Sequence, residues 1–208
     1  MRSDIPKQFL LLEGKPVLMH TITKFYLSDP AVEIILVLPA GQVPYWEELC
    51  RKYGFTIPVS LVHGGETRFH SVKNGLERVT EPGVVGVHDG VRPLLSPGLI
   101  SALYASALEK GNCIPCTLPH ESLRMQEEGR NYALDRSRCR LIQTPQCFDA
   151  ALLKKAYEAE YRREFTDDAT VVEAAGGTIY LHEGEPENIK ITTPADLAVA
   201  SVLINRAG

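Results

Sequence analysis

The sequence lacks the long apolar runs that mark membrane proteins. None of its apolar stretches approaches the roughly 20 residues that a membrane-spanning helix needs. Residues 1–7 (Met-Arg-Ser-Asp-Ile-Pro-Lys) also lack the apolar stretch of a signal peptide. We therefore expect a cytoplasmic protein with no membrane partner.

A basic excess is missing as well. Lys and Arg number 22 against 26 Asp and Glu, which gives a formal net charge of −4. Proteins with a general affinity for nucleic acid normally carry a net positive charge. We expect no nucleic-acid partner, and any anionic ligand has to be met by cations that are concentrated locally.

Several catalytic and cofactor motifs are absent. The chain contains neither Gly-x-Gly-x-x-Gly nor Gly-x-x-x-x-Gly-Lys, so it carries no dinucleotide fingerprint and no P-loop. The Gly-x-Ser-x-Gly turn of serine hydrolases is also missing. Five cysteines, an odd number, indicate reduced thiols. Cys113 and Cys116 form a single Cys-x-x-Cys, but their apolar surroundings favour a strand over a metal or redox site.

What the chain does have is an alternation of strand and helix patterns. Short β-branched runs alternate with amphipathic stretches, which predicts a doubly wound, mostly parallel α/β sheet in a single domain over residues 1–208. A polar turn between two short strand patterns predicts a hairpin arm at about 119–142. We expect strands at 33–39, 58–62, 84–87, 112–118, 178–181 and 188–192, and helices at 15–26, 45–53, 68–79, 96–110, 148–161, 167–175 and 194–205.

Residues 84–95 form the most informative stretch. An apolar strand pattern changes abruptly to charge at Asp89 and Arg92. Ligands of open α/β sheets bind beyond the carboxyl ends of the strands, where an Asp can hold a metal ion against a phosphate and an Arg can bind phosphate oxygens. The alternative is an Asp that caps the next turn and pairs with the Arg. His88 is interpreted as a structural hydrogen-bonding residue.

Other charged residues also stand where predicted strands give way to loops. Gathered at one rim of the sheet, they would neutralise a polyphosphate and leave an Asp for Mg²⁺, which is the pattern of phosphoryl or nucleotidyl transfer. The set comprises Lys7, Arg68, Asp89, Arg92, Arg136, Asp167, Asp168 and Lys190.

A series of segments, in order along the whole chain, resembles the 2-C-methyl-D-erythritol 4-phosphate cytidylyltransferase family. The resemblance implies a Rossmann-like nucleotidyltransferase fold, which uses CTP and Mg²⁺ to make a CDP derivative of methylerythritol phosphate in non-mevalonate isoprenoid synthesis. The segments that carry it are 4–9 (Asp-Ile-Pro-Lys-Gln-Phe), 64–71 (Gly-Gly-Glu-Thr-Arg-Phe-His-Ser), 87–93 (Val-His-Asp-Gly-Val-Arg-Pro), 135–136 (Asp-Arg), 143–146 (Gln-Thr-Pro-Gln), 166–169 (Thr-Asp-Asp-Ala) and 188–197 (Asn-Ile-Lys-Ile-Thr-Thr-Pro-Ala-Asp-Leu).

The resemblance also implies a role for individual residues. Asp89 would bind Mg²⁺, while Lys7 and Lys190 would contact the triphosphate and the α-phosphate of CTP as catalytic groups. The nucleotide pocket would be lined by Gly65, Glu66, Arg68 and Ser71. In a homodimer the arm would cross to the partner subunit and contribute to binding of the sugar phosphate, for which the implied residues are Arg92, Ser122, Arg136 and Thr166.

Two alternatives stay open. Ribitol 5-phosphate cytidylyltransferases have similar segments, and a catalytically silent binding or assembly module would keep the fold and the arm. The family has a strand and a Gly-x-Gly-x-Arg-Met loop before the point where this chain starts, and Met1 aligns with the last residue of that loop. The chain as given is therefore expected to bind CTP weakly and to lack one central strand.

Overall fold

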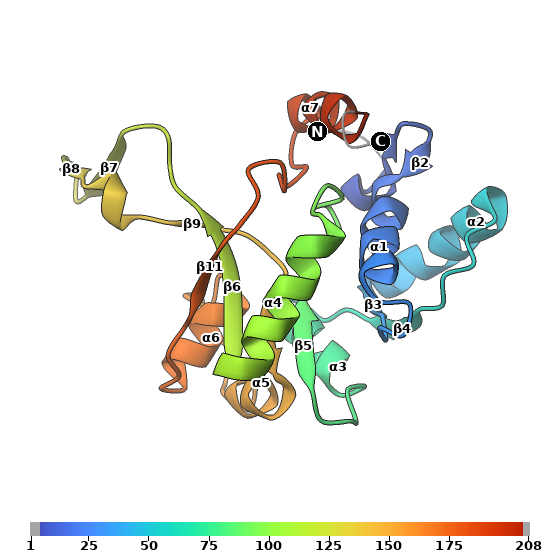
Figure 1. The fold of residues 1–208 in the computed structure, drawn as a ribbon, viewed down its shortest axis with the longest axis horizontal. Coiled ribbons are helices and arrows are strands. Elements are labelled where there is room, and N and C mark those ends of the chain that lie inside the picture. The colour runs from blue at the N-terminus through green and yellow to red at the C-terminus, as the bar shows by residue number, and fades with distance from the viewer. Residues whose placement is uncertain (1–4, 206–208) are drawn as a thin grey trace.

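The computed structural model describes residues 5–205, which form an α/β fold in which the strands divide into separate sheets (Figure 1). In the N-terminal part, β3 and β4 pair in parallel, with Ile35 opposite Ser60. Phe9, Met19 and Trp46 are among the side chains buried beside this pair. The elements here are η1 (Lys7–Phe9), β1 (Leu11–Leu12), β2 (Lys15–Pro16), α1 (Val17–Ser28), β3 (Ile35–Leu38), η2 (Ala40–Gln42), α2 (Val43–Tyr53) and β4 (Ser60–His63).

The remaining body is built on a five-stranded sheet with the order β11-β6-β10-β5, to which β9 adds by pairing with β6. Its core includes Phe148 and Ile114, which are both 0% exposed. The elements are α3 (Arg68–Leu76), β5 (Val84–Val87), α4 (Pro97–Lys110), β6 (Asn112–Thr117), β9 (Leu141–Ile142), β10 (Gln146–Asp149), α5 (Ala150–Ala156), α6 (Asp168–Ala174), β11 (Leu181–Glu183) and α7 (Pro194–Ile204).

Local signals in the sequence set several helix ends. The Ser96 side chain accepts a hydrogen bond from the backbone N–H of Leu99, Pro97 follows it in the first turn of α4, and Gly111 ends the helix with a left-handed backbone (φ 88°). Thr67 caps α3 in the same way, by accepting from the N–H of His70. These ends agree with the helix predicted at 96–110 and with the start predicted for 68–79.

Three predicted elements need correction. The helix predicted at 148–161 is preceded by strand β10, which is antiparallel to both β5 and β6, so the sheet is mixed. Phe148 lies inside that strand. The prediction was wrong here because a short apolar run fits a buried strand as well as a helix. Residues 188–192 form no strand, and the strand predicted at 178–181 begins only at Leu181.

Strands β3 and β5, one from each sheet, line a cavity of about 380 Å³. Consecutive residues of β3 and of β5 line it, and successive side chains of a strand point to opposite faces, so the cavity borders the hydrogen-bonding edges of both strands. In the paired registers of the described residues, β3 pairs only with β4 and β5 only with β10.

The predicted arm is present as the hairpin of β7 (Leu123–Glu127) and β8 (Arg130–Leu134), which projects from the body (Figure 1). Ten residues of the two strands pair in antiparallel register, and all but Leu123 and Leu134 are exposed. No helix within residues 5–205 has the length and apolarity to cross a bilayer. The cytoplasmic location stays a prediction.

Candidate active site

An ion-pair cluster stands at the carboxyl end of β5. The Asp89 carboxylate accepts from Lys190 Nζ at 3.0 Å and from Arg92 Nε at 3.2 Å, both through Oδ2. Burial alone would raise the pKa of Asp89, but the Lys190 and Arg92 cations outweigh it and hold that pKa below its usual value. The Asp89–Arg92 pair is the one that the simple turn interpretation expects, but Lys190, far along the chain, joins it. We call Asp89, Arg92 and Lys190 the Asp89 cluster.

The backbone beneath Asp89 is fixed by a chain of hydrogen bonds. The Arg92 carbonyl can only accept, so His88 Nε2 donates to it (3.1 Å) and His88 Nδ1 accepts from the Thr144 hydroxyl (3.0 Å). The Thr144 hydroxyl oxygen in turn accepts from the Asp89 N–H at 3.1 Å. Burial lowers the pKa of His88 to about 4, so the His88 ring stays neutral at neutral pH, as these hydrogen bonds require. The structural interpretation of His88 is confirmed.

Lys190 lies in a segment without regular secondary structure. Arg92 Nη1 donates to the Asn188 carbonyl (2.8 Å) and the Ile191 N–H donates to the Val91 carbonyl (2.9 Å), so the segment is tied to the loop after β5. The Asn188 side chain is fully buried and donates to the Thr144 carbonyl (2.9 Å). Its Oδ1 is the buried side-chain polar atom, among the described residues, that lacks a hydrogen-bond partner.

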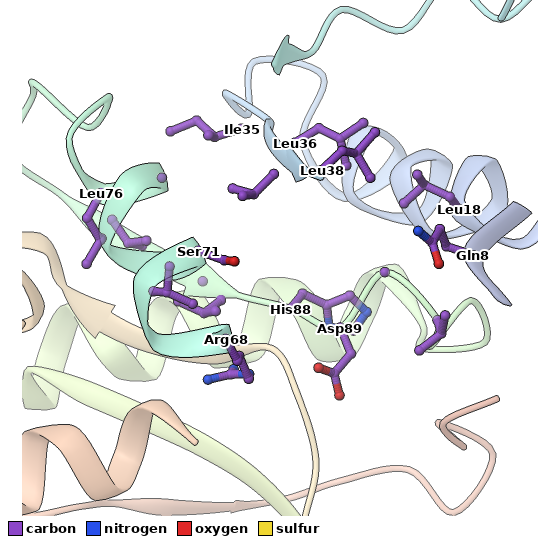
Figure 2. Close-up of a pocket in the computed structure, with 18 of the residues that line it drawn as sticks. Gln8, Leu18, Ile35, Leu36, Leu38, Arg68, Ser71, Leu76, His88 and Asp89 are labelled. Carbon is purple, nitrogen blue, oxygen red and sulfur yellow. The ribbon is translucent and has the colours of Figure 1, made fainter. Parts of the chain in front are cut away.

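Helix α3 lines the cavity through Arg68 and Ser71, and the loop between β4 and α3 leads into this helix. The Ser71 hydroxyl accepts from the Gly65 N–H (3.1 Å) and donates to the Thr67 carbonyl (2.9 Å), which folds the loop onto the first turn of α3. A Cβ at Gly65 would come within 2.4 Å of the His70 Cβ, so this close approach requires glycine. Glu66 is exposed in the same loop. Figure 2 shows Arg68 and Ser71 on α3 and Asp89 after β5, around the same cavity.

Arg68 does more than line the cavity. Its guanidinium binds the Asp168 carboxylate with two hydrogen bonds, of 3.1 and 2.5 Å, and Asp168 has no exposed surface. Tyr157 donates to the same carboxylate at 2.6 Å. Asp168 is therefore not a rim charge that faces a ligand, as the sequence analysis assumes, but the buried partner of one.

The other predicted residues do not join the Asp89 cluster. Lys7 and Thr166 are exposed, on η1 and just before α6. Ser122 and Arg136 are exposed at the base of the arm, where Arg136 donates to the His120 carbonyl. The chain thus brings together Asp89, Arg92 and Lys190, and Arg68 and Ser71 line the same cavity as Asp89. The arm residues of the same chain do not join them.

These groups suit the binding of a phosphorylated nucleotide. Cations beside a carboxylate at a strand end can bind phosphate oxygens. A sequence profile of the 2-C-methyl-D-erythritol 4-phosphate cytidylyltransferase family matches residues 1–206. The chain belongs to this family.

Relatives and solved structures agree with this assignment. The family member from Bacteroides fragilis is 52% identical over 204 residues, which covers 98% of this chain and 93% of that protein. The one from Porphyromonas gingivalis is 50% identical over 206 residues, covering 98% and 91%. The crystal structure of the Thermus thermophilus protein of the same name matches with a TM-score of 0.80 at 34% identity, over 96% of this chain and 94% of that one. The Rossmann-like α/β fold class is confirmed.

Sequence reasoning overlooked the buried polar residues that hold the candidate site in place. Thr144, Asn188 and Gln146 stand in segments that carry the resemblance, but no role was assigned to them. Their signal in the sequence is weak, because a buried amide or hydroxyl reads as an ordinary polar residue until its partners are known.

Proposed function

We propose that this chain transfers a cytidylyl group from CTP to 2-C-methyl-D-erythritol 4-phosphate, giving 4-diphosphocytidyl-2-C-methyl-D-erythritol and pyrophosphate. Relatives at about half identity carry the name of this activity. The single structural observation in support is the Asp89 cluster, where one carboxylate is held between two cations beside a cavity. The same names favour methylerythritol phosphate over the alternative substrate, ribitol 5-phosphate.

The reaction is a displacement at phosphorus. A phosphate oxygen of the sugar phosphate attacks the α-phosphorus of CTP, a new P–O bond forms, and the bond to the β-phosphate oxygen breaks with pyrophosphate leaving. No covalent enzyme intermediate and no proton acceptor on the protein are needed. The protein contributes cations: Lys190, whose side chain is 45% exposed, is assigned to the α-phosphate and Lys7 to the triphosphate.

The residues present fit an Mg²⁺ ion that is bound largely by substrate. Within residues 5–205 no group of three or more His, Cys, Asp or Glu side chains could hold a metal ion. Mg²⁺ in phosphoryl-transfer enzymes is typically bound by one or two carboxylates together with water and substrate phosphates, so Asp89 alone suffices on the protein side. When bound, the ion would neutralise charge on the phosphates and orient them.

The nucleotide is assigned to the loop before α3 and to the start of that helix, through Gly65, Glu66, Arg68 and Ser71. The sugar phosphate is assigned to Arg92 and Thr166 on the body and to Ser122 and Arg136 of a second subunit. The separation of the arm residues from the Asp89 cluster supports a homodimer in which each arm serves the partner's site.

Pyrophosphate release tests the reaction directly. The protein is incubated with CTP, Mg²⁺ and one polyol phosphate at a time. We expect faster release with methylerythritol phosphate than with ribitol 5-phosphate. The reverse order would change the proposed substrate, and a folded dimer without turnover on either would favour the silent binding module.

Mixing two variants tests the swapped arm. One variant chain carries Asp89→Asn and the other carries Arg136→Ala. If the arm crosses over, each site takes Asp89 from one subunit and Arg136 from the other. A heterodimer of the two variants then has one site with both substitutions and one site with neither. Subunit exchange should then restore up to about half of the wild-type activity per heterodimer. Failure to recover activity after demonstrated exchange would place Arg136 at the site of its own subunit.

A further inference from the structure

Asp168 is a fully buried carboxylate to which the proposed reaction gives no task. It accepts two hydrogen bonds from Arg68 and one from the Tyr157 hydroxyl. Burial alone would lower the pKa of Arg68, but Asp168 raises it above its usual value, and burial together with Asp168 raises the pKa of Tyr157. Arg68 thus stays charged and Tyr157 stays neutral, and the two-bond geometry holds the guanidinium in one plane.

The pair joins two helix starts. Arg68 is the first residue of α3, directly after the 64–67 loop that is assigned to the nucleotide. Asp168 is the first residue of α6, two positions after Thr166, which is assigned to the sugar phosphate. Each residue therefore anchors the helix turn next to one of the two substrate loops.

The α6 end of this connection is itself fixed to the sheet. Gln146 of β10 donates to the Asp167 carboxylate (2.8 Å) and accepts from the Ala169 N–H (2.9 Å). Asp167 also caps α6 by accepting from the Thr170 N–H at 2.9 Å. The first turn of α6 is thus a rigid support, to which Arg68 ties the first turn of α3.

We propose that Arg68 and Asp168 form an internal strut that sets the distance between the nucleotide loop and the sugar-phosphate loop. Asp168 is then a positioning residue that acts on both substrates, and Arg68 holds α3 in place in addition to its role beside the nucleotide. This inference rests on the proposed function, because it takes from it which loop serves which substrate.

The central test is Asp168→Asn, which keeps the shape of the side chain and removes the charge. With each substrate varied in turn, we expect kcat/KM to fall roughly tenfold or more for both CTP and methylerythritol phosphate, because a small displacement of one loop misaligns the two reactants. A fall for CTP alone would mean that Arg68 acts as a direct nucleotide contact. A lowered melting temperature with unchanged kinetics would make the pair purely structural. Either result overturns the strut.

Tyr157→Phe is the matched control. It removes one hydrogen bond from the same buried carboxylate and leaves the ion pair in place, so both kcat/KM values should stay within about threefold of wild type. If Asp168→Asn does not fold, Arg68→Lys takes its place as the test. It keeps the charge but loses the planar fork, so kcat/KM should fall for both substrates. A tenfold loss in Tyr157→Phe would contradict a role specific to the ion pair.

Amide hydrogen exchange separates this inference from the proposed function. Exchange needs no substrate, so it applies even if the wild-type protein turns over neither polyol phosphate. Asp168→Asn, or Arg68→Lys in its place, should speed exchange in both segments, 64–71 and 165–170, relative to wild type. Unchanged exchange in the 64–71 segment would overturn the strut whatever the activity of the protein.

Discussion

The body and the arm hold their site residues in different ways. On the body, the Asp89 carboxylate has two cationic partners. The Asp89 N–H donates to the Thr144 hydroxyl, which in turn donates to His88. On the arm, Arg136 donates one hydrogen bond to a backbone carbonyl, and Ser122 is exposed. One group is fixed before any ligand arrives, while the other belongs to a hairpin that projects into solvent.

The two groups of residues differ in what fixes them: folding of one chain fixes the first group, and packing of the arm on another surface would fix the second. Charges fixed by several partners cost no reorganisation when phosphate charge has to be stabilised, which is what the reacting centre needs. An exposed hairpin is marginal as a separate unit and gains order when it packs on another surface. Under the proposed function, the body would carry the reacting charges, and the arm would act after dimerisation.

The largest effect is expected where the body's cluster loses its carboxylate. Asp89→Asn should lower kcat by roughly a hundredfold or more, because an amide cannot replace the anionic oxygen that a hard cation prefers. Steady-state pyrophosphate release over a range of Mg²⁺ concentrations measures it. Circular dichroism should show an intact fold. Activity near that of wild type would remove Asp89 from the reacting centre.

The next effect concerns the arm. Arg136→Ala should raise KM for methylerythritol phosphate by roughly tenfold to a hundredfold, through loss of a charge-assisted hydrogen bond, and should leave KM for CTP nearly unchanged. Arg130→Ala, at the tip of the hairpin, is the matched control and should change neither constant. An equal rise for both substrates would contradict an arm that serves only the sugar phosphate.

The support beneath Asp89 can be probed by pH. The pKa of His88 is lowered by burial to about 4, from about 6.5 in the unfolded chain, so only the unfolded state takes up this proton between those values. Stability is thus unaffected above pH 6.5 and falls as the pH drops from 6.5 to 4. Between pH 7 and 5, the free energy of unfolding should fall by about 2 kcal/mol less in His88→Gln than in the wild type. Urea unfolding at both pH values measures this, and parallel pH profiles would contradict a buried neutral ring.

The smallest effect is expected for the exposed face of the arm. Met125 and Tyr132 are opposite one another in the hairpin and are 39% and 48% exposed. Tyr132→Ser should change the unfolding free energy of the monomer by no more than about 0.5 kcal/mol, because no packed core is lost. Measured under conditions where sedimentation shows monomer, a loss above 1 kcal/mol would mean that the arm packs on its own body.

Elements with local signals are the ones that sequence reasoning located well. Ser96, Pro97 and Gly111 mark both ends of α4 because caps and left-handed turns depend on single residue types. The antiparallel strand around Phe148 was missed because its apolar run fits two structures, and only its neighbours β5 and β6 make it a strand. Three of the residues 188–192 are β-branched, yet the backbone of this segment bonds to the loop after β5 instead of to a strand ladder.

The sequence by itself determined the alternation of strands and helices, the arm, and the charged residues around Asp89, since periodicity, turns and residue chemistry are local properties. The resemblance along its length led to the family. Only the tertiary structure decided that Lys190 joins Asp89, and that Asp168 turns inward to Arg68 instead of facing a ligand. The physical reason is that a charge acquires its role from its partners, and partners that are distant in sequence meet only when the chain has folded.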